Sequence, residues 1–192
     1  MKRPFVITVA SEKGGVGKTT IATNLAVYLK ALREDLPVTI TSFDNHFSVD
    51  QMFALGSQPE GSVANLVEGC PIEELAVLGQ YGVQYVASSR RLRPPKHDPA
   101  WLRQRVSAST LDGVLILDTR PILDWFTAAA LLTADLVIVP VKDRAALINA
   151  GSLRQIMADA GRAEKLWLLP SLVLIATAAS LHGLAARRKA MA

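Results

Sequence analysis

The stretch SEKGGVGKTT, residues 11–20, follows directly after the apolar run FVITVA of residues 5–10. A strand, a glycine-rich loop and a helix that opens on Lys-Thr-Thr form the arrangement that holds the phosphates of a nucleotide. The glycines let successive backbone N–H groups turn toward the anion, and the helix N-terminus adds its positive dipole. A tight turn without a ligand would need neither Lys18 nor the two threonines. The sequence therefore predicts a phosphate-binding loop.

This loop offers three kinds of contact to a nucleotide. Lys18 supplies a positive charge to the β and γ phosphates, and the hydroxyl of Thr19 can bind Mg²⁺. The general pattern GxxxxGK[ST] requires glycine where this chain has Glu12, so the variant KGGVGKTT applies instead. The predicted binding residues are Gly14, Gly15, Val16, Gly17, Lys18, Thr19 and Thr20.

Apolar runs alternate with helical patterns along most of the chain. Further β-type runs occupy residues 38–43, 83–87, 114–117, 136–141 and 166–169, and apolar residues recur at helical spacing in residues 19–33, 98–108, 123–134 and 145–160. Nearly continuous apolar runs are typical of strands covered on both faces. The chain is therefore predicted to form an α/β fold with a doubly wound, mostly parallel sheet flanked by helices. We expect residues 1–192 to be a single domain.

Composition excludes several classes of site. The 192 residues carry 21 Lys and Arg against 17 Asp and Glu, for a net charge of +4, and half of them are apolar, as in a globular protein. The single cysteine, Cys70, excludes an intrachain disulfide, a CxxC redox pair and a thiolate metal site within one chain. The first apolar run is short and is followed at once by Glu12 and Lys13, so it indicates a strand rather than a secretion signal. We expect a cytoplasmic protein.

Two acidic residues stand where a second set of functional groups is expected. Ligands of such folds lie at the carboxyl ends of the strands. Asp44 follows the strand at 38–43 within TSFDNHFSVD, and a helix N-cap or a turn is the alternative interpretation of this residue. Asp118 ends the apolar run VLILD, where an unpaired carboxylate is costly without a function. Asp118 is therefore predicted to bind Mg²⁺, together with Thr19.

KGGVGKTT is the pattern of the deviant Walker A ATPases, and residues 5–150 resemble the ParA/MinD family of that group. The likeness includes AAALLTADLVIVPVKDR, residues 128–144, which is similar to a helix, an Ala-Asp turn and a strand of that family. The resemblance implies ATP as the nucleotide and a second lysine, here Lys13, that reaches across a two-fold interface to the nucleotide of the other subunit. It also implies that Asp44 orients the attacking water.

The chain departs from the family pattern at two positions. Ser42 stands where the first acidic residue of a D-x-D pattern is usual, and Arg120 replaces a proline in the DTPP or DCPP pattern after Asp118. Ser42 affects the expected Mg²⁺ handling or rate of hydrolysis more than nucleotide binding. Arg120 is compatible with a phosphate contact or with a solvated side chain.

The resemblance implies a slow ATPase with catalytic residues Lys13, Lys18 and Asp44, stimulated by a partner protein and forming an ATP-dependent homodimer. Partitioning or positioning of DNA or of another large cargo is the implied use. A nucleotide-dependent regulatory scaffold that dimerises with ATP and hydrolyses little of it is the first alternative. A P-loop biosynthetic ligase is the second.

Members of the family bind DNA through basic surface residues or membranes through a C-terminal amphipathic helix. A basic set here could neutralise DNA phosphates, although an ordinary solvated face explains it nearly as well: Arg90, Arg91, Arg93, Lys96, Arg103 and Arg105. The tail at 180–192 offers Leu181 and Leu184 but mostly alanine afterwards, which is a thin apolar face for a membrane. DNA is therefore favoured over a membrane.

The C-terminal end, residues 166–192, is atypical for the family. Residues 166–186 contain no Asp, Glu, Lys or Arg, so a membrane span has to be considered. Pro170 interrupts this stretch and small or polar residues dilute it. A buried strand followed by a small-residue helix is therefore the preferred interpretation. No asparagine stands where relatives contact adenine, so the adenine contacts stay unassigned.

Overall fold

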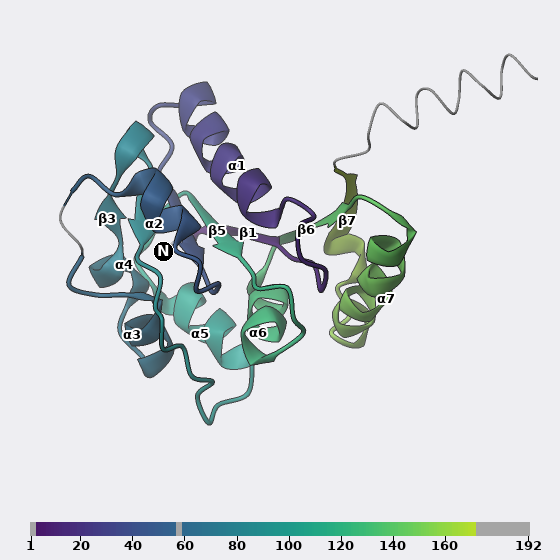
Figure 1. Cartoon of the computed structure of the whole chain (residues 1–192). Coiled ribbons are helices and arrows are strands. Elements are labelled where there is room, and N and C mark those ends of the chain that lie inside the picture. The colour runs from purple at the N-terminus through teal and green to yellow at the C-terminus, as the bar shows by residue number, and fades with distance from the viewer. Residues whose placement is uncertain (1–2, 57–58, 172–192) are drawn as a thin grey trace, which may run out of the picture.

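The computed structural model describes residues 3–56 and 59–171, and its centre is a seven-stranded sheet (Figure 1). The strand order is β3-β4-β2-β5-β1-β6-β7. The strands are β1 (Phe5–Val9), β2 (Val38–Ser42), β3 (Val77–Leu78), β4 (Gln84–Val86), β5 (Val114–Asp118), β6 (Leu136–Val141) and β7 (Leu166–Pro170). Only β3 and β4 pair antiparallel, and the other neighbours are parallel. The predicted mostly parallel sheet is confirmed.

Helices cover both faces of this sheet, as Figure 1 shows. One face carries α1 (Lys18–Leu32) and α2 (Ser48–Phe53). The other carries α3 (Val63–Glu68), α4 (Ile72–Leu75), α5 (Ala100–Ala108), α6 (Trp125–Thr133) and α7 (Arg144–Asp159). Two short 3₁₀ helices, η1 (Gln80–Gly82) and η2 (Ala163–Lys165), precede β4 and β7. The doubly wound arrangement predicted from the sequence is therefore present.

The central strands are buried on both sides because their residues alternate between two apolar layers. Val6 of β1 packs with the α5 and α6 side chains, whereas Ile7 packs with α1. Ala22 and Ala26 of α1 are fully buried, and their small side chains allow the helix to lie close to the sheet. This packing fixes the ends of the strands relative to one another.

Strand register brings three carboxyl ends to the same level. Val9 of β1 pairs with Asp118 of β5, and Ser42 of β2 pairs with the same residue from the other side. The loop at residues 10–17 leaves β1 at this edge and leads into α1. The predicted phosphate loop and both predicted acidic segments therefore meet at one edge of the sheet.

The shortest elements were not predicted from the sequence, and the burial predicted for the last strand is wrong. The sequence shows no signal for β3, α2, α3 and α4, each of which spans two to six residues. The strand predicted at 166–169 is present as β7, but its predicted burial is wrong. Trp167 is 66% exposed and Leu168 48% exposed, because β7 is the last strand of the sheet.

The remainder of the atypical C-terminal end lies outside the described residues. This applies to residues 172–192, with His182, Leu181, Leu184 and the predicted small-residue helix. Within residues 3–56 and 59–171, none of the helices combines the length and the apolar character needed to cross a bilayer.

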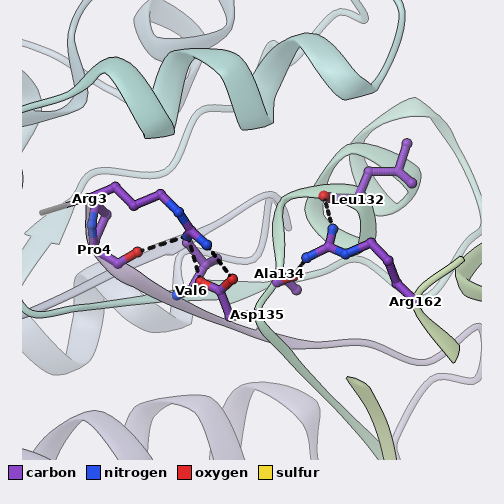
Figure 2. Close-up of polar contacts among 7 residues, drawn as sticks. All are labelled: Arg3, Pro4, Val6, Leu132, Ala134, Asp135 and Arg162. Atoms are coloured by element: carbon purple, nitrogen blue, oxygen red, sulfur yellow. Dashed lines mark hydrogen bonds and ion pairs between the residues drawn. The ribbon is translucent and has the colours of Figure 1, made fainter. Parts of the chain in front are cut away.

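Two arginines bind the turn between α6 and β6 (Figure 2). This turn precedes β6, so it lies at the end of the sheet opposite the phosphate loop, which follows β1. Arg3 donates to both carboxylate oxygens of Asp135 at 2.6 Å, and the backbone N–H of Val6 donates to the same carboxylate at 3.0 Å. Arg162 is only 7% exposed and donates to the backbone carbonyls of Leu132 and Ala134. These contacts join the start of β1, the end of α6 and η2.

The pKa of Asp135 reflects this environment. Burial acts to raise it, but the hydrogen bonds from Arg3 and from the Val6 N–H outweigh burial and hold the pKa below the ordinary value. The ionised carboxylate therefore stabilises the folded state.

We expect Asp135→Asn to lower the free energy of unfolding by about 1 kcal/mol at neutral pH, because solvent at the partly exposed Arg3 screens the ion pair. Since the folded-state pKa is depressed, the stabilisation is present above the unfolded-state pKa of about 4 and is lost as the pH falls through the folded-state pKa. Urea unfolding across this range measures the difference between wild type and variant. A difference that persists undiminished at about pH 3 would contradict this assignment.

Candidate nucleotide-binding site

The loop between β1 and α1 has the backbone conformation expected of a phosphate cradle. Gly15 and Gly17 have φ angles of 65° and 89°, in the left-handed region that glycine enters without strain. Gly14 and Gly15 are exposed, Val16 is fully buried below them, and Thr20 is exposed on the first turn of α1. The loop is thus anchored by one apolar side chain while its glycine backbone faces outward.

Lys18 is the first residue of α1 and is only 7% exposed. Its Nζ donates to the backbone carbonyl of Lys13 at 3.2 Å. Burial lowers the pKa of Lys18, while the charges of Asp118 and Asp44 act in the opposite direction. A poorly solvated ammonium at a helix N-terminus gains from the arrival of a phosphate, because the anion supplies the charge that water no longer screens.

Asp118 is fully buried at the end of β5. Its Oδ2 accepts hydrogen bonds from the hydroxyls of Thr19 at 2.8 Å and Ser42 at 2.9 Å. Its Oδ1 is buried without a hydrogen-bond partner. Burial raises the pKa of Asp118 to about 6, against the lowering effect of the two hydroxyls and Lys18. The carboxylate is therefore incompletely satisfied in the absence of a cation.

These residues fit Mg²⁺. The ion prefers oxygen ligands and is usually held by one or two carboxylates together with substrate phosphates. The orphaned Oδ1 of Asp118 and the Thr19 hydroxyl supply such oxygens beside the loop. In the part of the chain that the structure describes, no group of three or more His, Cys, Asp or Glu side chains could hold a metal ion by itself.

Asp44 lies in the loop after β2, close to Asp118. Its backbone N–H donates to the Ser42 Oγ at 3.1 Å, and the Ser42 hydroxyl donates in turn to Asp118. The alternative that Asp44 caps a helix is wrong, since α2 begins at Ser48 and its N-cap residue is Phe47. His46 Nε2 lies 3.7 Å from Asp44 Oδ1. Ser42 thus links the two acidic residues instead of adding a third charge.

Lys13 pairs with the N-cap residue of α7. Its Nζ pairs with Asp143 Oδ2 at 2.6 Å, and the other carboxylate oxygen of Asp143 accepts the backbone N–H of Ala146 as the N-cap of α7. Bonding to Lys13 is the main reason that the pKa of Asp143 is lowered. The second lysine is therefore held at the rim of the site by the start of α7.

Three contacts at this rim were not anticipated from the sequence. Lys142 Nζ donates to the Gly15 carbonyl at 3.1 Å, Ser171 Oγ donates to the Val16 carbonyl at 2.9 Å, and Asp143 binds Lys13. All three residues follow the ends of β6 and β7. Because parallel strands end at the same edge, the position of polar residues after each predicted strand could have indicated them.

Arg120 is not simply solvated, so that alternative considered from the sequence is wrong. Its Nε donates to the Phe43 carbonyl at 3.2 Å and its Nη1 to Asp124 Oδ2 at 3.1 Å. The guanidinium carbon lies 4.9 Å from the centroid of the Phe126 ring. Arg120 therefore connects the loop after β5 to the loop after β2.

The predicted basic set divides into free and engaged side chains. Arg91, Arg93, Lys96 and Arg103 are exposed. Arg105 donates to the Gly69 carbonyl and lies over the Trp101 ring, and Arg90 lies over the Phe47 ring. The loop that carries most of these residues is tied to α6, since the Trp125 indole N–H donates to the His97 carbonyl at 2.7 Å.

A cavity of about 710 Å³ lies elsewhere, beside α2 and β4. Its lining includes Phe47, Asp50, Tyr85 and Ser88 and none of residues 13–20. The phosphate loop is therefore a surface cradle at the edge of the sheet rather than the wall of this cavity.

Comparison with known proteins identifies relatives of this chain. A family model described as "AAA domain" matches residues 5–165. The chain is 33% identical over 147 residues to the chromosome-partitioning ATPase Soj of Thermus thermophilus, which covers 71% of this chain and 54% of Soj. It is 34% identical over 124 residues to the antiactivator FleN of Pseudomonas aeruginosa, which covers 59% of this chain and 42% of FleN. The chain thus spans about half the length of these curated relatives.

Among solved structures, the fold is similar to that of a plasmid partition protein of Borrelia burgdorferi B31 bound to AMPPNP. The TM-score is 0.76 at 23% sequence identity, with 88% of this chain and 74% of that chain covered. At this level of identity the likeness concerns the fold.

Replacing the buried carboxylate should stabilise the protein in the absence of ligands. Asp118→Asn keeps an oxygen that can accept from Thr19 and Ser42 but removes a charge whose burial costs a few kcal/mol. Because the folded-state pKa is raised, the folded state binds more protons between about pH 4 and 6, and wild-type stability falls as the pH rises through this window. The variant should therefore melt at a higher temperature than wild type at neutral pH, and the two should converge near pH 4.

Thermal unfolding followed by circular dichroism, without nucleotide and with EDTA, measures this difference. A wild type as stable as Asp118→Asn at neutral pH would show that the buried charge is compensated by other groups.

Proposed function

Because the chain belongs to the ParA/MinD family of P-loop ATPases, we propose that it is an ATP-dependent dimerisation switch that hydrolyses ATP slowly. Its use would be the partitioning or positioning of DNA or of another large cargo in the cytoplasm, with residues 1–192 acting as one ATPase domain. One observation carries the proposal: the residues predicted to bind phosphate and Mg²⁺ meet at one edge of the sheet, and Lys13 pairs with Asp143 at the rim of that edge.

In this proposal the chain stabilises charge rather than forming covalent bonds. The loop amides and Lys18 bind the β and γ phosphates, and Thr19 and Asp118 hold Mg²⁺. When bound there, the ion would neutralise charge on the phosphates. Asp44 accepts a hydrogen bond from the attacking water and orients it toward the γ phosphate.

Lys13 explains why dimerisation would depend on ATP. In the single chain its charge is matched by Asp143. The γ phosphate of ATP bound to a second subunit carries more negative charge than a carboxylate and accepts stronger charge-assisted hydrogen bonds. Lys13 can therefore leave Asp143 and bind this phosphate across a two-fold interface. ADP lacks this group. The free energy gained when Lys13 exchanges Asp143 for the γ phosphate therefore couples dimerisation to the presence of ATP.

The DNA surface of this switch would consist of the exposed basic residues on the loop after β4. Arg91, Arg93 and Lys96 are free to neutralise phosphates, whereas Arg105 is engaged with Gly69 and Trp101. The proposal also includes a partner protein that binds this chain and accelerates its hydrolysis of ATP.

A regulatory scaffold that binds ATP with little hydrolysis is the second candidate. It is favoured by Ser42, which replaces an acidic residue beside Asp118, and by the likeness to FleN, whose name describes an antiactivator. Turnover separates the two candidates, because ATP-linked dimers without measurable hydrolysis would support the scaffold.

We expect the wild-type chain to double its mass with Mg²⁺–ATP and to stay monomeric with Mg²⁺–ADP, as measured by light scattering. Lys13→Ala should stay monomeric with either nucleotide, because Lys13 is the one residue proposed to contact the nucleotide of the other subunit. Asp44→Ala is the matched control, since it should dimerise with ATP but hydrolyse it at least tenfold more slowly.

A monomer under every condition would contradict the shared-nucleotide switch. If Lys13→Ala still dimerises with ATP, the two subunits associate through another surface.

The triple variant Arg91→Gln, Arg93→Gln, Lys96→Gln should weaken binding to duplex DNA and reduce its dependence on salt. The slope of log affinity against log salt should fall by about one for each lost phosphate contact. Fluorescence anisotropy with a labelled duplex, Mg²⁺–ATP and a series of salt concentrations measures it. Arg33→Gln is the control, because Arg33 lies beyond the far end of α1 and pairs with Asp35. An unchanged slope in the triple variant would exclude this loop as the DNA surface.

A further inference from the structure

The peptide group between Phe43 and Asp44 is held at both of its polar atoms by side chains. Its N–H, which belongs to Asp44, donates to the Ser42 Oγ at 3.1 Å. Its carbonyl, which belongs to Phe43, accepts from the Arg120 Nε at 3.2 Å. Ser42 and Arg120 are the two residues at which the sequence departs from the family pattern. Both departures therefore act on one peptide.

Arg120 is itself fixed in place. Its Nη1 bonds Asp124 Oδ2, while the other carboxylate oxygen of Asp124 accepts the Thr127 N–H at the start of α6. The guanidinium lies over the Phe126 ring, and that ring packs against Phe43 with centroids 5.7 Å apart. Arg120 thus joins the Phe43 carbonyl to a helix, which is a rigid support.

Ser42 is fixed from the other side. It is 3% exposed, and its hydroxyl donates to Asp118 Oδ2 while accepting the Asp44 N–H. A carboxylate at this position could only accept, and it would bring a second negative charge against buried Asp118. A hydroxyl is the group that can serve both neighbours at once.

We propose that Arg120 and Ser42 are positioning residues for Asp44. With both ends of its preceding peptide held, the Cα–Cβ bond of Asp44 has a set direction, and the carboxylate is presented at the edge where Lys18 and Asp118 lie. The inference deepens the proposed function, because it rests on Asp44 as the residue that orients water.

Amide hydrogen exchange tests the positioning without nucleotide. In the 20.7 kDa chain, NMR can follow the single amide of Asp44. Arg120→Met keeps the length of the side chain but removes its donors, so the peptide can rotate and the Asp44 amide should exchange about tenfold faster. Arg120→Lys keeps the positive charge but lacks the forked guanidinium that donates to two acceptors at once. In this variant the exchange rate of the Asp44 amide should lie between those of wild type and Arg120→Met.

Arg3→Met is the matched control. Like Arg120, Arg3 donates to one backbone carbonyl, that of Pro4, and to one carboxylate, that of Asp135 (Figure 2). Arg3 precedes β1 and Arg120 follows β5, so the two lie at opposite ends of the sheet. Removal of Arg3 should leave exchange at Asp44 unchanged. If Arg120→Met does not fold, Arg120→Lys carries the test. Equal exchange at Asp44 in wild type and in the folded Arg120 variant would overturn the inference.

Turnover gives the second readout. Because Asp44 acts on water and not on the binding of ATP, Arg120→Met should lower kcat about tenfold or more and leave KM for ATP unchanged, with partial recovery in Arg120→Lys. A rise in KM with unchanged kcat, or equal losses in Arg3→Met, would assign Arg120 a merely structural role. A wild type without turnover would count against the proposed hydrolysis, while the exchange measurement still decides whether Arg120 positions Asp44.

Discussion

A buried negative charge at the end of β5 organises the functional edge of this protein. Asp118 is fully buried. One of its carboxylate oxygens accepts hydrogen bonds from hydroxyls of α1 and β2, while the other has no hydrogen-bond partner. Because burial of a charge is unfavourable unless it is matched, the helix and the neighbouring strand supply polar groups to this one carboxylate. Thr19 and Ser42 donate to it, and the charge of Lys18 acts in the same sense.

The sequence predicted those features that depend on residues close to one another in the chain. Six apolar runs became strands, and the glycine loop with Lys18 and Thr19 stands where its pattern indicated. Asp118 could be assigned to the same edge because parallel strands end together. The elements α2, α3, α4 and β3 could not be predicted, since two to six residues are too few to show a period.

The features that escaped prediction depend on pairs far apart in the chain. Lys13 meets Asp143 across 130 residues, and Arg120 meets Phe43 across 77. Neither partner has a local signal, because each pairing is decided by how β6 and α6 dock on the sheet. For the same reason Ser42 and Arg120 read as isolated departures in the sequence, whereas in the structure they serve one peptide. Residues that break a family pattern are therefore best judged together.

The hydrogen bond from the Trp125 indole to the His97 carbonyl spans the start of α6 and the basic loop after β4. Any nucleotide-driven movement at the start of α6 has to carry His97 along or break this bond. If the loop holds an anion and the sheet edge a nucleotide, as proposed, such a movement would couple the two binding steps. Thermodynamic reciprocity then requires that each ligand alters the affinity of the other by the same factor.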